Sequence, residues 1–112
     1  KIAEGIVAKY PGTSMEYIQQ EQYRNMKEVL DKHPEIVTYA AEAIQRTGLA
    51  VKTESIRGGT DGSRLSYMGL PCPNIFTGMQ NIHSKLEWIG VNDMMKAAET
   101  IVHLCMIWEE KS

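Results

Sequence analysis

A glycine-rich segment near the middle of the chain, RGGTDG at residues 57–62, most constrains the fold. Two adjacent glycines allow a positive φ or a close approach by another group, so this segment is expected to be a loop. Asp61 suits a helix start, because its carboxylate can accept hydrogen bonds from the unpaired N–H groups of the first turn. Gly69 and Pro71 predict that this helix ends near Met68, since proline cannot continue it.

Three segments have the composition of strands. Residues 51–56 are β-prone and lead directly into the glycine-rich loop. Residues 15–23 alternate imperfectly between apolar and polar side chains, which is typical of an antiparallel strand on a partly solvated sheet. Residues 74–77 predict a brief strand that Gly78 ends, and the chain then enters a loop that carries His83.

The remaining segments follow a helical repeat. Residues 1–10 read as a helix stopped by proline and glycine, and residues 25–30 and 34–47 predict two more. A last, long helix begins at Asn92 or Asp93 and is expected to cover a sheet face. Its apolar positions, three or four residues apart, are Met94, Ala98, Ile101, Cys105 and Trp108. Helices that alternate with short strands are typical of an α/β domain.

Composition and charge argue against several classes of function. The 112 residues suffice for one modest domain, and a net charge of −2 with interspersed signs argues against a nucleic-acid partner. No apolar run approaches the ~20 residues that cross a bilayer, so no membrane partner is expected. The chain opens on Lys1 with no visible signal peptide. It also lacks an initiator Met, which suggests that its start is a cut or a boundary. Cys72 and Cys105 have no disulfide-framework spacing, which favours a reducing, cytoplasmic compartment.

Three motifs in order, RGGTDG at 57–62, GLPCPNIFTG at 69–78 and NIHSKLEW at 81–88, carry a resemblance to a known family. Together they resemble the tripeptidase (peptidase T) branch of the two-zinc aminopeptidase family, which is related to carboxypeptidase G. The resemblance covers roughly residues 17–102. It is specific because three separate motifs agree, whereas a lone GGTD would be weak.

The resemblance implies an α/β (α+β) fragment of a zinc exopeptidase. Residues 25–112 would be the C-terminal portion of the catalytic domain, with helices packed on a short sheet. Residues 1–24 would be the last helix and strand of a lid or dimerisation domain. The family's other zinc ligands and its general-base glutamate belong to an N-terminal portion that nothing here matches, so no catalytic residue is expected in this chain.

His83 is the expected metal ligand. Neutral imidazole is a common zinc ligand, and the resemblance implies that this histidine holds one zinc of the pair. The alternative from the residues alone is a surface histidine paired with Glu87, four positions later. Glu87 itself is either an acceptor for the imidazole N–H or a solvated carboxylate. Ser84 stands where close relatives often carry glycine.

The expected substrate-binding residues are Arg57 and Asn25. A guanidinium matches a carboxylate bidentately, and the resemblance implies that Arg57 grips the terminal carboxylate of a peptide. Without the resemblance, Arg57 reads as a surface residue at a strand end. Asn25 matches a family residue that reaches toward the substrate, but it also suits a helix N-cap. Four residues would shape the site: Gly58, Gly59, Thr60 and Asp61.

The function implied is that of a zinc aminopeptidase releasing N-terminal residues from short peptides, with two zinc ions in the intact enzyme and the isolated chain inactive. Its expected partners are the peptide substrate, the missing N-terminal part and, as a further expectation, a second copy in a homodimer. Two alternatives stay open. One is a non-enzymatic peptide-binding or dimerisation module, and the other is a zinc amidohydrolase that acts on acylated amino acids.

Overall fold

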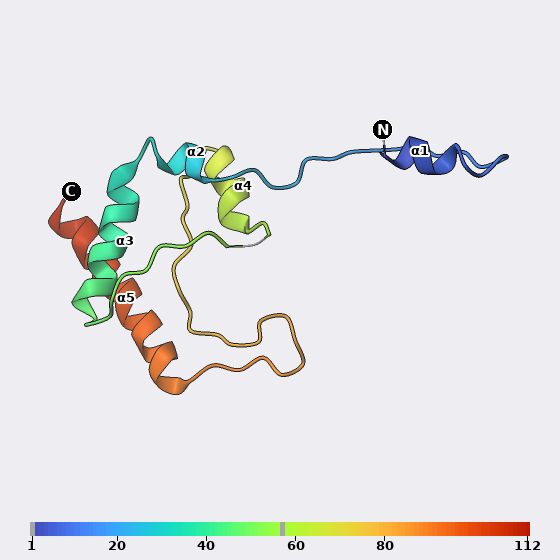
Figure 1. Cartoon of the computed structure of the whole chain (residues 1–112). Coiled ribbons are helices and arrows are strands. Elements are labelled where there is room, and N and C mark those ends of the chain that lie inside the picture. The colour runs from blue at the N-terminus through green and yellow to red at the C-terminus, as the bar shows by residue number, and fades with distance from the viewer. Residues whose placement is uncertain (1, 57) are drawn as a thin grey trace.

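The computed structural model describes residues 2–56 and 58–112, which form an elongated molecule 66 Å in its longest dimension (Figure 1). The helices of this described part are α1 (Ile2–Val7), α2 (Lys27–Leu30), α3 (Pro34–Arg46), α4 (Asp61–Tyr67) and α5 (Val91–Glu110). Each corresponds to a helix that the sequence predicts, with ends that differ by a few residues.

Local chemistry explains where the longer helices begin and end. Proline opens α3 at its first position, where a missing N–H costs nothing, and Gly48 with φ 82° follows its end. Before α4, Thr60 has extended backbone (φ −129°, ψ 161°), and Gly69 with φ 100° lies beyond its last turn. The predicted helix signals at Pro34, Gly48 and Gly69 are therefore confirmed.

The short sheet expected from the sequence is not confirmed. Residues 15–23, 51–56 and 74–77 contain no strand, and the described part of the chain holds only an isolated antiparallel bridge between Gln80 and Trp88. A strand exists through the ladder of hydrogen bonds to a neighbouring strand. The three segments make no backbone hydrogen bond to one another, so their β-propensity has no partner here.

The core lies between α3 and α5. Ala43 from α3 and Ile107 and Thr100 from α5 are fully buried. Tyr39 meets Trp108 edge to face, with ring centroids 4.8 Å apart. This is the main tertiary contact between helices, since most other large apolar side chains of the described residues are partly exposed.

The prediction that the apolar positions of the last helix are buried against a sheet is wrong. Met94 and Ile101 are about half exposed, at 53% and 51%, and Trp108 is 42% exposed. The side of α5 that meets α3 instead carries Thr100 and Ile107. A helix buries the side that faces its neighbour, and the neighbour here is α3 rather than a sheet.

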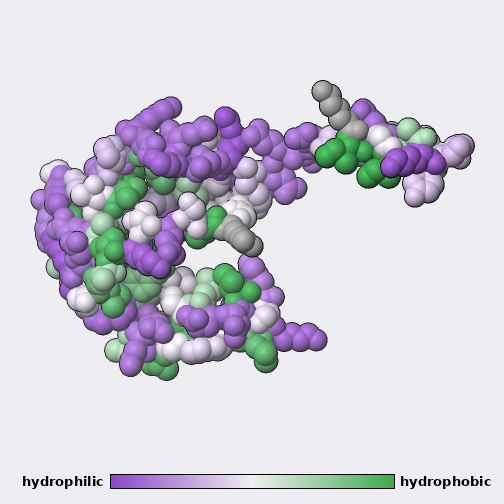
Figure 2. Space-filling model, viewed as in Figure 1, coloured by the Kyte–Doolittle hydropathy of each residue, from purple (hydrophilic) through white to green (hydrophobic). Residues whose placement is uncertain are grey.

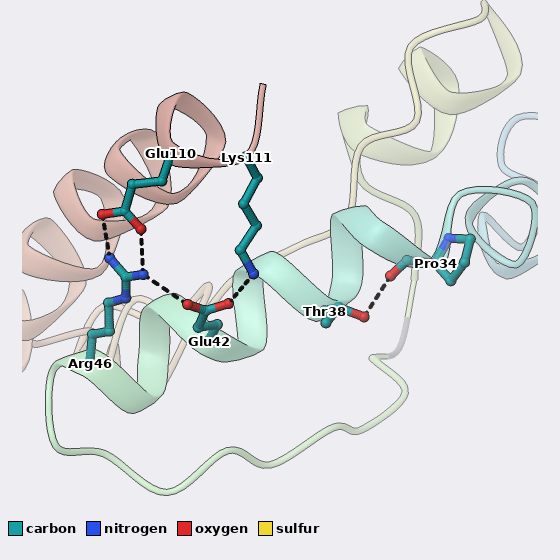
Figure 3. A network of polar contacts seen from close by, with 6 residues as sticks. All are labelled: Pro34, Thr38, Glu42, Arg46, Glu110 and Lys111. Carbon is teal, nitrogen blue, oxygen red and sulfur yellow. Dashed lines mark hydrogen bonds and ion pairs between the residues drawn. The ribbon is translucent and has the colours of Figure 1, made fainter.

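An ion network joins the ends of α3 and α5 (Figure 3). The Arg46 guanidinium donates to both oxygens of Glu110, at 3.0 and 2.7 Å, and to Glu42 at 2.8 Å. The Lys111 ammonium donates to the other Glu42 oxygen at 2.7 Å. Lys111 and Arg46 together lower the pKa of Glu42, and Arg46 lowers the pKa of Glu110.

The N-terminal arm, residues 2–24, extends away from the other helices and carries α1 at its far end (Figure 1). Its helix buries no residue, with Ile2 84% and Ile6 54% exposed, and Figure 2 shows this apolar surface in solvent. No helix in the described ranges is both long and apolar enough to span a membrane.

Candidate functional site

The short helix α4 is the centre on which several motif segments converge. The Ser63 hydroxyl donates to the carbonyl oxygen of Arg24, at the end of the N-terminal arm. The Tyr67 hydroxyl lies 2.9 Å from the carbonyl oxygen of Asn25 and 2.9 Å from Oε2 of Glu28, so its single proton is shared between them. Desolvation, followed by the bond to Glu28, raises the pKa of Tyr67 and keeps the hydroxyl a donor.

The two glycines before α4 are required for different reasons. Gly58 has φ 82°, a left-handed conformation that side chains other than glycine adopt at a cost. Gly59 has no such φ, but a methyl group built on it would overlap the ring of Tyr23. Glycine at 59 is therefore demanded by the close approach of an aromatic ring from the N-terminal arm.

The second motif packs against the same helix. The backbone N–H of Cys72 donates to the Ser66 hydroxyl at 2.9 Å, and a Cβ on Gly62 would come within 2.7 Å of the Cys72 carbonyl oxygen. The Asn74 amide donates to Thr60 Oγ1 at 3.3 Å. Small residues on α4 thus let residues 72–74 approach the loop that precedes it.

The structure gives the predicted site residues near α4 local roles. Asn25 Oδ1 accepts the backbone N–H of Lys27 at 3.0 Å, so this side chain supports the start of α2. Thr60, rather than Asp61, precedes the first residue of α4, and neither side chain caps that helix. The expected capping by Asp61 is therefore wrong. Arg57 lies outside the described residues.

His83 lies on a separate loop, which we call the histidine loop (residues 80–88). Gln80 and Trp88 close it through two backbone hydrogen bonds of 2.8 and 3.2 Å. Within it, Ser84 N–H donates to the Asn81 carbonyl at 3.1 Å, and Leu86 N–H donates to Ser84 Oγ at 3.1 Å. The loop therefore satisfies many of its polar groups locally, without help from the helices.

The backbone at His83 is unusual. His83 has φ 64° and Asn81 has φ 52°, the left-handed region that a non-glycine residue occupies at a cost. The Glu87 carboxylate accepts the His83 backbone N–H at 2.8 Å and makes no contact with the imidazole. The alternative of an imidazole–Glu87 pair is not seen; the imidazole is exposed and has no partner among the described residues.

These features fit part of a metal site. An exposed imidazole without a hydrogen-bond partner, on a locally closed loop, can give a ring nitrogen to zinc. The described residues hold no group of three or more His, Cys, Asp or Glu side chains arranged for a metal ion. His83 could thus supply one metal ligand, and the described residues around it do not complete a metal site.

The structure brings some of the predicted residues together and not others. Asn25 accepts a hydrogen bond from Tyr67 of α4, and Gly59 and Thr60 directly precede that helix. A pocket of about 250 Å³ lies between residues 21–24 and residues 63–68 of the α4 region. No hydrogen bond or ion pair between described residues joins the histidine loop to Asn25 or to residues 58–61. The substrate-binding and metal-binding expectations therefore fall on two separate parts of this chain.

The sequence did not predict that Tyr23 and Tyr67 contact the candidate site. Both contact predicted site segments, yet Tyr67 is 42 positions away from the Asn25 carbonyl to which it donates. No periodic pattern encodes such a pairing. The available signal was the small-residue spacing of Gly62 and Ser66, which indicates a close-packed face on α4.

Comparison with known proteins gives consistent matches. The model of peptidase family M20/M25/M40 matches residues 4–107. Peptidase T of Bacillus licheniformis is 46% identical over all 112 residues, which are 27% of that relative. Peptidase T of Bacillus velezensis is likewise 46% identical over the whole chain and 27% of its own length. Peptidase T of Shewanella pealeana is 50% identical over 91 residues, 81% of this chain and 22% of the relative. The chain thus spans about a quarter of the length of these relatives.

Proposed function

The chain belongs to peptidase family M20/M25/M40, and from this premise we propose that it is the C-terminal portion of a zinc-dependent aminopeptidase of the tripeptidase type. The intact enzyme would hydrolyse the N-terminal peptide bond of short peptides. The observation that carries the proposal is the histidine loop, which holds an unpaired, exposed His83 imidazole in a left-handed backbone conformation. The identity to peptidase T of several bacteria supports the tripeptidase class.

His83 would be this chain's contribution to the metal site. Zinc, when bound, would lower the pKa of a water molecule and polarise the scissile carbonyl. The residues of this chain hold the histidine loop and the His83 backbone in place. The Gln80–Trp88 pair closes the loop, and the Glu87 carboxylate fixes the His83 backbone N–H. Both leave the imidazole free to bind metal, with ligands from outside this chain completing the set.

Arg57 and Asn25 would position the peptide. Arg57, adjacent to the glycine pair in the sequence, would bind the C-terminal carboxylate, while Asn25 would reach toward the substrate. Tyr67 and the Lys27 N–H hold Asn25 in place, which supports a fixed rather than a mobile asparagine. Gly58, Gly59, Thr60 and Asp61 would shape this half of the site.

The remaining expectations belong to the same proposal. Residues 1–24 would end a lid or dimerisation domain, and residues 25–112 would complete the catalytic domain. The exposed apolar surface of α1 supports a role for the arm in contacts with other parts of the intact enzyme or with a second copy. A cytoplasmic location would suit the free Cys72 and Cys105 thiols.

The test is His83→Ala in the intact enzyme. We expect most of the activity to be lost and the zinc content to fall by about one equivalent or more, because zinc sites need about four ligands. Lys85→Ala, on the same loop, is the matched control and should keep metal and rate. Elemental analysis and rates at saturating zinc measure both. Full zinc and wild-type turnover in His83→Ala would remove His83 from the metal site.

Arg57→Ala tests the substrate half. Loss of a charge-assisted pair should cost about 1.5–3 kcal/mol with tripeptides that have a free C-terminus, and much less with amidated ones. Equal losses for the two substrates would remove Arg57 from this role. A metal-bearing parent that hydrolyses acylated amino acids but not peptides would favour the amidohydrolase alternative, and a parent without bound zinc would favour the binding module.

A further inference from the structure

An aromatic clasp, composed of Tyr23, Arg24, Arg64 and Tyr67, joins the end of the N-terminal arm to α4. The Arg24 guanidinium lies 4.5 Å from the centre of the Tyr67 ring, and the Arg64 guanidinium lies 4.9 Å from that of Tyr23. Each segment therefore offers one tyrosine and one arginine to the other. Cation–π contacts of this kind favour a defined geometry between the two segments.

Each tyrosine of the clasp also contacts the backbone of a segment that the proposed function assigns to the substrate. The Tyr23 ring occupies the space beside Gly59 that a Cβ would need, so it packs directly on the glycine loop (residues 58–60), which follows residue 57 in the sequence. The Tyr67 hydroxyl, 2.9 Å from the Asn25 carbonyl oxygen, holds the backbone that carries the Asn25 amide. The clasp thus contacts both Gly59 of the glycine loop and the backbone of Asn25.

We propose that Tyr23 and Tyr67 are positioning residues that set the glycine loop and Asn25 relative to each other and to the peptide substrate. The proposal rests on the proposed function, because it takes residue 57 and Asn25 as the substrate contacts. Neither tyrosine touches the reacting atoms. They act through backbone placement, and a displacement of about 1 Å in a substrate-binding group can cost up to roughly 100-fold in rate.

The readout is a specificity ratio, kcat/KM for a free tripeptide divided by kcat/KM for its C-terminal amide, measured in the intact enzyme. General destabilisation lowers the amount of active enzyme and affects both substrates equally, so it leaves this ratio unchanged. Displacement of the loop that binds the carboxylate lowers the ratio. Tyr23→Ala is expected to lower it about three- to tenfold through KM, and Tyr23→Phe, which keeps the ring, should restore it.

Gly59→Ala provides a second, independent variant. Its methyl group must displace the Tyr23 ring, so it should lower the ratio as Tyr23→Ala does. The double variant should be no worse than either single one, because both disrupt the same contact. Gly5→Ala, where an added Cβ meets nothing within 4 Å, and Tyr10→Ala, 63% exposed on the arm, are matched controls that should keep the wild-type ratio.

Tyr67→Phe tests the other half of the clasp. It keeps the ring beneath Arg24 and removes only the hydroxyl that holds Asn25. We expect KM to rise about threefold or more for free and amidated peptides alike, with kcat little changed, because Asn25 does not bind the carboxylate. An unchanged KM in this variant would overturn the role of Tyr67.

Arg57→Ala separates failure of this inference from failure of its premise. If Arg57→Ala lowers the ratio while Tyr23→Ala and Gly59→Ala leave it unchanged, Tyr23 is not a positioning residue and the proposed function stands. If Arg57→Ala itself leaves the ratio unchanged, the premise fails and the inference fails with it. A double variant whose loss equals the product of the two single losses also overturns the inference.

Discussion

The α3–α5 pair and the histidine loop, which precedes α5 in the sequence, are held by different interactions. The pair depends on side chains far apart in the chain, such as buried Ala43 and Ile107 and the bond from Arg46 to Glu110, 64 positions away. The loop depends on hydrogen bonds between residues at most eight positions apart, from Gln80 to Trp88, and all its residues are exposed.

This difference separates the residues that stabilise the chain from those with a proposed function. Burial of apolar surface is the dominant favourable contribution to folding, so substitutions in the α3–α5 pair should act on the free energy of unfolding. The histidine loop buries little apolar surface and contributes little to that free energy, but it fixes the backbone of His83. Loops on a stable scaffold commonly carry functional side chains for this reason.

Ile107→Ala should have the largest effect on stability. The side chain is fully buried between α5 and α3, so its loss removes apolar contacts and leaves a cavity. We expect the free energy of unfolding to fall by about 2–5 kcal/mol, measured by urea denaturation with circular dichroism.

Ile101→Ala, on the same helix but 51% exposed, is the matched control and should cost well under half as much. If the two variants were equally destabilising, the α3–α5 contact would not be the core of this chain.

Acid should weaken the α3–α5 pair through its ion network. The pKa values of Glu42 and Glu110 are lowered in the folded state from an ordinary value of 4.5. Their contribution to stability is therefore present above about pH 4.5 and is lost as the pH falls through the lowered values. The melting temperature should drop in that range, by less than in Ile107→Ala, because the network is partly exposed and screened by salt.

Arg46→Ala sharpens this test. It removes the partner that the two carboxylates share, so the melting temperature should become less dependent on pH below about 4.5. Lys52→Ala removes a cation that is paired with Glu54 and with neither carboxylate of the network, so it should leave the acid response unchanged. An unaltered pH profile in Arg46→Ala would contradict the assigned role of the network.

Much of the helical structure could be predicted because its signals are local. Proline at 34, glycine at 48 and 69, and the apolar repeats are properties of neighbouring residues. Such local signals could not establish a sheet, because a strand needs a partner strand that the segment itself does not specify. The buried face of the last helix was also mispredicted, because several of its faces are apolar and only the position of α3 selects among them.

The candidate site, like the fold, could be predicted only in part from the sequence. That His83 lies on a loop follows from Gly78 and the motif around it, whereas its positive φ is not encoded by any residue type at that position. The requirement for Gly59 was expected from the glycine pair, but its cause, the Tyr23 ring, is a contact 36 residues apart and visible only in the structure. Long-range packing is what sequence patterns leave undetermined.

His83→Gly should stabilise the histidine loop relative to His83→Ala. At φ 64°, a residue with a Cβ costs about 1 kcal/mol or more that glycine avoids. We expect the free energy of loop opening, from hydrogen exchange of the Trp88 amide, to be higher in His83→Gly by about 0.5–1 kcal/mol. Urea unfolding of the α3–α5 pair should not change. An order of stability with alanine above glycine would show that the backbone at 83 is not strained.

Ser84→Ala should have the smallest effect, confined to the histidine loop. It removes the hydroxyl that accepts the Leu86 N–H at 3.1 Å, a bond between exposed groups that water can replace. We expect the Leu86 amide to exchange faster by a factor that corresponds to about 0.5 kcal/mol, while amides of α5 keep their protection. Ser84→Thr, which retains the hydroxyl, is the control and should restore slow exchange. Faster exchange along α5 in Ser84→Ala would mean that the loop and the helical pair unfold as one unit, and the separation between them would be lost.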